Sequence, residues 1–197
     1  ANRTAFDMND KHGIPGPFTI ARVRAMVAAL AGICATHLVF AVVCYGSLPD
    51  SIPFHFDAAG KPDHYVPLGA GSWFLLWFIS AGIGALFGGF SLKIHTMPER
   101  YLSLPRKQAF LSLPPEAKAR VWAVAAFHML VFTAIFMLVF LTLHIFAALV
   151  AFEVVDRLPV VWLLAGIGAS IAETIVMTVR LLNVVNAEID RNARRAR

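Results

Sequence analysis

The sequence is poor in charged residues and in cysteine. Only 15% of its 197 residues are charged while 58% are hydrophobic, and the mean hydropathy is +0.69. This balance excludes an ordinary soluble domain and indicates an integral membrane protein. The two cysteines, Cys34 and Cys44, fall on one expected helix about 15 Å apart by helix rise, which excludes a disulfide framework.

The sequence also lacks the short motifs that mark common enzyme classes. It contains no HExxH, CxxC, P-loop or GxSxG pattern, so a catalytic function rests on unpatterned residues alone. We therefore expect a protein that is not an enzyme and that has no cofactor.

Four apolar segments are long enough to cross a hydrocarbon core, which needs about 20 residues per helix. We expect an all-α, polytopic membrane protein with four transmembrane helices at about 25–47, 71–92, 121–152 and 160–184. The third segment is about 48 Å long by helix rise, beyond a core of about 30 Å. Because Ser112, two prolines and Glu116 form a helix start signal, this helix should begin outside the hydrocarbon core.

Basic residues are distributed unevenly along the chain. Lys and Arg outnumber Asp and Glu by four to two in 1–24, six to two in 93–120 and four to two in 185–197. Loop 48–70 has one basic residue and three acidic ones. The positive-inside rule then places both termini in the cytoplasm and loop 48–70 outside it. The net charge of +5 fits anionic lipid rather than nucleic acid, so we expect the lipid bilayer as a partner and no nucleic acid.

Small residues cluster on the second and fourth expected helices. Gly84 and Gly88 form a GxxxG pair on the second, and Gly168 lies on a small face of the fourth, so we expect these helices to make the tightest contact. Two interpretations stay open, packing within the bundle and an interface with other membrane subunits or a second copy.

Ionisable residues inside the expected helices are few and are functional candidates by default. His37 lies about 18 Å and Glu173 about 16 Å from the inner ends of their helices, so we expect them to approach each other. Glu173 then serves either as a protonated contact between helices or as a proton carrier. Arg180 should reach the lipid headgroups, and His144 lies close enough to the outer end to approach the external loop.

The external loop combines rigidity with polar side chains. Four prolines and Gly60 should hold it in an ordered conformation. Three interpretations remain open, a structural role for the aspartates in turns, metal or proton binding, and recognition of a ligand. The recognition candidates are Asp50, His55, Phe56, Asp57, Asp63 and His64, and the metal candidates are His55, Asp57, His64 and His144.

The stretch LPDSIPFHFDAAGKPD, residues 48–63, resembles the hallmark of small bacterial membrane proteins grouped as domain of unknown function 1648. They are related to SdpI-type immunity and signal-transduction proteins. The resemblance covers about residues 25–95. It implies a multi-pass protein of the bacterial cytoplasmic (inner) membrane, in a group whose SdpI-type members protect against a secreted peptide toxin and hold a repressor at the membrane.

Three functions are compatible with these features. The first is a non-enzymatic immunity or sensor protein that recognises an external ligand through loop 48–70. The second is an accessory subunit of a respiratory, photosynthetic or oxygenase complex. The third is a metal-dependent membrane enzyme or transporter.

Overall fold

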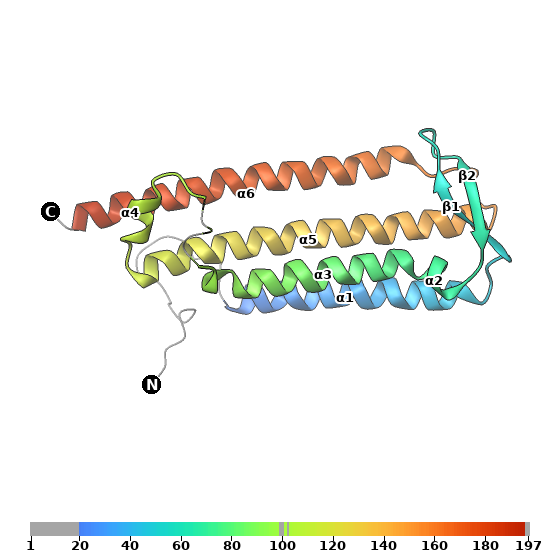
Figure 1. The fold of residues 1–197 in the computed structure, drawn as a ribbon, viewed down its shortest axis with the longest axis horizontal. Coiled ribbons are helices and arrows are strands. Elements are labelled where there is room, and N and C mark those ends of the chain that lie inside the picture. Colours follow the sequence, from blue (N-terminus) through green and yellow to red (C-terminus); the bar gives the residue numbers. More distant parts are fainter. Residues whose placement is uncertain (1–19, 99–100, 102, 196–197) are drawn as a thin grey trace.

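Four long helices form the body of the molecule in the computed structural model, which describes residues 20–98, 101 and 103–195 (Figure 1). They are α1 (Ile20–Tyr45), α3 (Leu75–Lys93), α5 (Pro115–Ala151) and α6 (Val160–Arg195). The short elements are β1 (Ser51–Phe56), β2 (Pro62–Pro67), α2 (Ala70–Trp73), η1 (Ile94–Thr96) and α4 (Lys107–Leu111). The greater part of the expected tail 1–24 lies outside the described residues.

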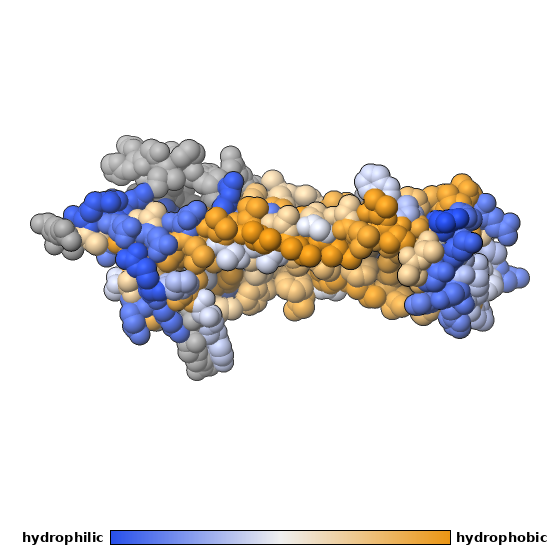
Figure 2. All heavy atoms as spheres, turned by 90° about the horizontal axis from the view of Figure 1, so that it is seen from above, coloured by the Kyte–Doolittle hydropathy of each residue, from blue (hydrophilic) through white to orange (hydrophobic). Residues whose placement is uncertain are grey.

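The surface of the bundle matches a membrane environment. All four helices are long and apolar enough to cross a bilayer, as the sequence predicts. Hydrophobic residues cover the middle of the helix bundle, and hydrophilic residues gather at its two ends (Figure 2). Large apolar side chains such as Val43 and Leu86 are 70% and 67% exposed, a cost that lipid removes. The chain is therefore a multi-pass membrane protein.

Helix α5 is the centre of the bundle. It packs against α1, α3 and α6, whereas α6 contacts α5 and, at one end, α4. Small residues on the outer helices make room for α5 side chains. A Cβ atom on Gly84 would lie 2.9 Å from the Met137 sulfur, and one on Gly166 would lie 2.4 Å from a Val139 methyl carbon.

The prediction that the second and fourth helices make the tightest contact is wrong. Gly84 of α3 and Gly166 of α6 both face side chains of α5 rather than each other, and α3 and α6 each pack mainly against α5. Gly88 does face another helix, because its nearest neighbour is Leu30 of α1 at 3.6 Å. Gly168 has no atom within 4 Å of the position that a Cβ would occupy, and it does not take part in packing within the bundle.

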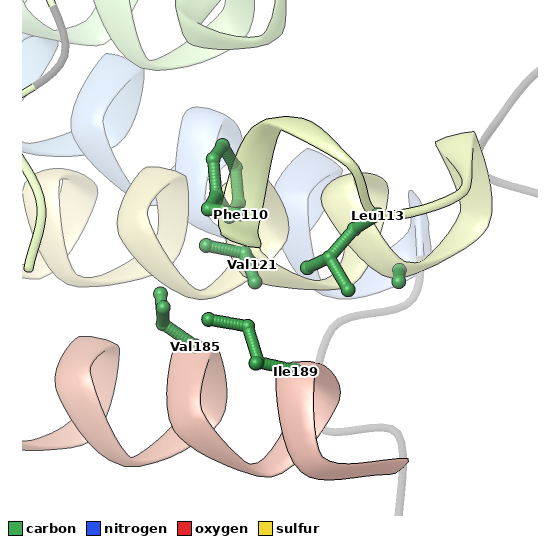
Figure 3. Packing of buried hydrophobic residues seen from close by; sticks show 6 residues of the cluster. Phe110, Leu113, Val121, Val185 and Ile189 are labelled. Atoms are coloured by element: carbon green, nitrogen blue, oxygen red, sulfur yellow. The ribbon is translucent and has the colours of Figure 1, made fainter. Parts of the chain in front are cut away.

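The bundle end opposite the strands extends beyond the apolar belt. Pro115 occupies the first turn of α5 with Glu116 beside it, which confirms the expected start signal and moves the helix start six residues before position 121. Helix α6 continues to Arg195, so residues 185–195 are helical. Phe110, Leu113, Val121, Val185 and Ile189 join α4, α5 and α6 in an apolar cluster (Figure 3).

Ion pairs surround this cluster. Arg120 of α5 donates two hydrogen bonds to the Glu188 carboxylate, at 2.9 and 2.7 Å, and Arg191 donates a third at 3.1 Å. The Glu188 side chain is only 4% exposed. Charge-assisted bonds therefore satisfy a nearly buried carboxylate and fix the extension of α6 on α5.

The segment between α1 and α3 is a β-hairpin, an addition to the expected all-α fold. Strands β1 and β2 pair antiparallel, with Ser51 opposite Pro67 and His55 opposite His64. The register is irregular around His55. Since prolines begin and end β2, the two strands stay short.

Candidate functional site

The tip of the hairpin is held by the side chain of Asp57. Its Oδ1 atom accepts hydrogen bonds from the backbone N–H groups of Ala59, at 2.8 Å, and Lys61, at 2.9 Å. Its own N–H donates to the Lys61 carbonyl at 2.8 Å. Gly60 adopts φ 80°, a conformation that favours glycine. Asp57 thus has the turn-forming role that was one of the sequence-based interpretations.

The tip is also docked on the connection between α5 and α6. The N–H of Leu158 donates to the Gly60 carbonyl at 2.8 Å. Gly60 is buried, and a Cβ atom there would lie 2.3 Å from the Leu158 carbonyl oxygen. Two separate reasons therefore favour glycine at position 60, its left-handed backbone conformation and the close approach of the two backbones.

The inner side of the hairpin enters the apolar core. Ile52 is 3% exposed and belongs to a cluster with Ala41, Trp73 and Ala148, from three different helices. Trp73 donates its indole N–H to the Ala41 carbonyl at 2.8 Å. The hairpin is thus attached to the helices both at its tip and through its first strand. The ordered loop expected from the sequence is this hairpin.

We call the exposed residues of the hairpin its outer side; they include polar and aromatic side chains. His55 Nδ1 lies 2.6 Å from Asp63 Oδ1, and these side chains are 67% and 46% exposed. Phe54 and Tyr65 are 47% and 51% exposed. The carboxylate of Asp63 orients the exposed His55 ring through Nδ1.

The remaining candidates from the sequence lie around this surface. His64 is exposed and stands opposite His55 in the strand pairing. Asp50 is exposed and its carbonyl accepts the N–H of Leu68, while Phe56 is half-buried.

The metal candidates do not converge. Among the described residues, no three His, Cys, Asp or Glu side chains are placed to hold a metal ion. Asp57 already accepts two backbone hydrogen bonds, and His144 is buried inside the bundle, apart from the exposed pair of the hairpin.

An ion pair lies beside the hairpin tip. Arg157 donates hydrogen bonds to Asp156, the shortest at 2.7 Å. This hydrogen bond lowers the pKa of the Asp156 carboxyl, and the positive charge of Lys61 on the hairpin acts in the same direction. The pair is thus held mainly within the α5–α6 connection, with a small electrostatic contribution from the hairpin tip.

Two pairs of polar residues lie deeper in the bundle. His37 Nε2 and His144 Nδ1 share a hydrogen bond of 2.9 Å, and both residues are 0% exposed. His128 Nδ1 and Glu173 Oε1 are 2.6 Å apart, with side chains 5% and 14% exposed. Helix rise separates the two pairs by about 24 Å along α5.

The expected approach of His37 to Glu173 is wrong, because each residue has a different partner. Depth alone placed them at the same level, but α5 pairs His144 with His37 of α1 and, sixteen residues earlier, pairs His128 with Glu173 of α6. Arg180 is exposed, and its reach toward the headgroups stays a prediction.

Three residues that hold these polar pairs and the hairpin in place were not predicted from the sequence. They are His128, Trp73 and Leu158. The signal for His128 was available, because an intramembrane carboxylate requires a partner and α5 carries only two histidines. The backbone contact of Leu158 had no such signal.

Comparison with known proteins gives one family. Nothing matches among curated proteins or among solved structures. Residues 32–81, which include the second half of α1, the whole hairpin and the first part of α3, match the family model described as Domain of unknown function (DUF1648). This match supports the domain family that the loop motif indicates for this part of the chain.

Proposed function

We propose that this protein is a non-enzymatic membrane protein of the immunity or sensor type, which recognises an external ligand through the outer side of its hairpin. The observation that carries the proposal is the asymmetry of the hairpin. One side is fixed by Ile52 in the core and by Gly60 on Leu158. The other side exposes Phe54, His55 and Tyr65.

A docked hairpin with exposed aromatic side chains has the properties of a recognition surface. Aromatic groups supply large contact areas at small entropic cost, and a rigid support reduces the ordering that binding requires. The His55–Asp63 pair adds a polar group of fixed orientation. The proposal needs the hairpin on the outside, which the positive-inside rule supports because basic residues dominate 93–120 and 185–197.

Complementation in a bacterial host tests this function. A strain that lacks the gene is challenged with a panel of secreted peptides and envelope stresses, then supplied with the wild type or with the triple variant Phe54→Ala, His55→Ala, Tyr65→Ala. We expect the wild type to restore resistance and the triple variant to fail while reaching the membrane in equal amount.

The matched control is Gln108→Ala, an exposed position at the opposite end of the bundle, which should complement fully. Full complementation by the triple variant, or no phenotype with any agent, would contradict the proposal.

A second function, that of an accessory subunit of a larger membrane complex, is favoured by the exposure of α6. Only 6% of its most apolar stretch is buried, against 28% for α5. Its exposed residues include Ala165, Gly168, Ala169 and Ala172, a small-residue face of the kind that lets another helix approach. Purification in mild detergent followed by mass spectrometry distinguishes the two functions, since an accessory subunit brings stoichiometric partners and a sensor is recovered alone or as a homo-oligomer.

A further inference from the structure

The His37–His144 pair is the most unusual polar feature of the bundle. Both imidazoles are fully buried between α1 and α5. Two of their four nitrogens share the hydrogen bond. The other two, His37 Nδ1 and His144 Nε2, are buried without a hydrogen-bond partner. Buried polar atoms of this kind are rare and call for a reason.

The geometry of the pair identifies what the two rings share. Their centroids are 5.1 Å apart with an interplanar angle of 70°, and the facing nitrogens are 2.9 Å apart. The rings thus meet nitrogen to nitrogen, with room for one proton between them. Two neutral imidazoles carry two N–H groups. One is in the shared bond, and the other lies on one of the outer nitrogens while the remaining outer nitrogen keeps a lone pair.

The surroundings of the pair are apolar. The Trp73 ring lies 4.1 Å and the Phe40 ring 5.5 Å from the His144 ring, centroid to centroid. The titratable groups nearest along these elements are Cys34, Cys44 and Tyr45 of α1, and none of them is a carboxylate.

The other packed elements add no counter-ion in their described parts. Helix α2 has no titratable side chain, and those of α3 and α5 are Lys93, Glu116, Lys118, Arg120 and His128, all toward the other end of the bundle. On β1 the titratable residue is His55, which pairs with Asp63 outside. A positive charge on the buried pair would therefore stand alone in an apolar environment, a costly state.

We propose that the His37–His144 pair is a proton-binding site whose protonation releases the hairpin from its seat on the bundle. The proton comes from water and adds to the outer nitrogen that carries the lone pair, forming one N–H bond. Both outer nitrogens are then donors without acceptors, next to an uncompensated charge. The rings are stabilised when they separate and admit water.

Movement of His144 reaches the hairpin through Trp73. The indole ring rests on His144, and Trp73 shares an apolar cluster with Ile52 of β1. Loss of this support weakens the inner attachment of the hairpin. The inference deepens the proposed function and rests on it, since it assigns a pH-dependent control to the recognition surface.

Amide hydrogen exchange of the full chain in lipid nanodiscs tests the inference. The reporters are the hairpin amides and Leu158 N–H, which bonds to the hairpin tip. After correction for intrinsic exchange, lowering the pH from about 7.5 to about 5 should speed exchange by up to about tenfold per pH unit, the limit for one linked proton.

The variant His37→Gln, His144→Gln should lose this pH dependence. His55→Gln with His64→Gln, and separately His128→Gln, should keep it. Absence of pH-dependent exchange in the wild type, or its persistence in the His37→Gln, His144→Gln protein, would overturn the inference.

A second measurement does not depend on variant folding. Nitrogen NMR of wild-type protein labelled with ¹⁵N-histidine should show the buried pair taking up one proton over the range in which hairpin exchange accelerates. Rings that stay neutral through that range would equally overturn it. Resistance that depends on the hairpin but not on pH would remove this inference alone and leave the proposed function intact.

Discussion

Replacement of Gly60 by alanine should detach the hairpin tip from the bundle. The left-handed backbone at φ 80° costs a residue with a Cβ atom about 1–2 kcal/mol. The new Cβ would also lie 2.3 Å from the Leu158 carbonyl oxygen, so the two segments must separate. The hydrogen bond from Leu158 N–H to Gly60 is then lost, which removes about 1 kcal/mol.

Together these contributions amount to about 2–3 kcal/mol, or between about 30-fold and 150-fold in the equilibrium between docked and detached states. Amide exchange at Leu158 reports the docked state directly. Exchange of Asp57 N–H, which bonds to the Lys61 carbonyl within the turn, reports whether the turn itself survives. We expect Leu158 exchange to accelerate by the stated factor in the Gly60→Ala protein.

Gly71→Ala is the matched control, because nothing lies within 4 Å of the added Cβ and φ is not in the left-handed region. Equal exchange at Leu158 in the Gly60→Ala and Gly71→Ala proteins would refute the reasoning that the tip is held by close backbone contact.

Three further predictions concern the bundle and its ends. Gly166→Leu should destabilise the protein by about 1–3 kcal/mol through overpacking. Gly168→Leu, at an open position, should change the stability by less than about 0.5 kcal/mol. Denaturant unfolding in detergent compares the two variants, and equal effects would contradict the observed packing. Glu188→Gln should cost about 2 kcal/mol, because a nearly buried carboxylate loses its charge-assisted bonds, and an unchanged unfolding midpoint would be inconsistent with those bonds. Arg157→Gln should raise the pKa of Asp156, since the Arg157 hydrogen bond lowers it. Any contribution of this pair to folding stability is present at neutral pH and is lost as the pH falls through the lowered pKa. An NMR titration in which the pKa of the Asp156 carboxyl is unaffected by the substitution would count against the pair.

Composition and segment length were sufficient to predict four membrane-spanning helices. Lipid imposes one requirement, a long apolar segment with internally satisfied backbone groups, and that requirement is visible in the sequence. The start of α5 at Pro115 was also predictable, because prolines and an acidic residue favour the first turn. The extension of α6 to Arg195 was not, because Val185 and Ile189 pack against α4 and α5 in contacts that the sequence does not reveal.

Helix arrangement and residue pairing could not be predicted from depth and composition. Depth gave His37 and Glu173 the same level, but it did not indicate that α5 lies between their helices and supplies a histidine to each. Gly84 and Gly168 looked equivalent as small residues, yet one faces Met137 and the other faces away from the bundle. These differences depend on helix rotation and neighbours, which a single sequence leaves undetermined.

Accessibility of the hairpin from outside the cell tests the central claim most directly. In a Cys34→Ser, Cys44→Ser background, Ala58→Cys and Gln108→Cys each place one thiol at an exposed position, at opposite ends of the bundle. Intact cells are treated with a membrane-impermeant maleimide. The account predicts labelling at position 58 and protection at position 108 until the cells are lysed. Labelling at 108 with protection at 58 would contradict it.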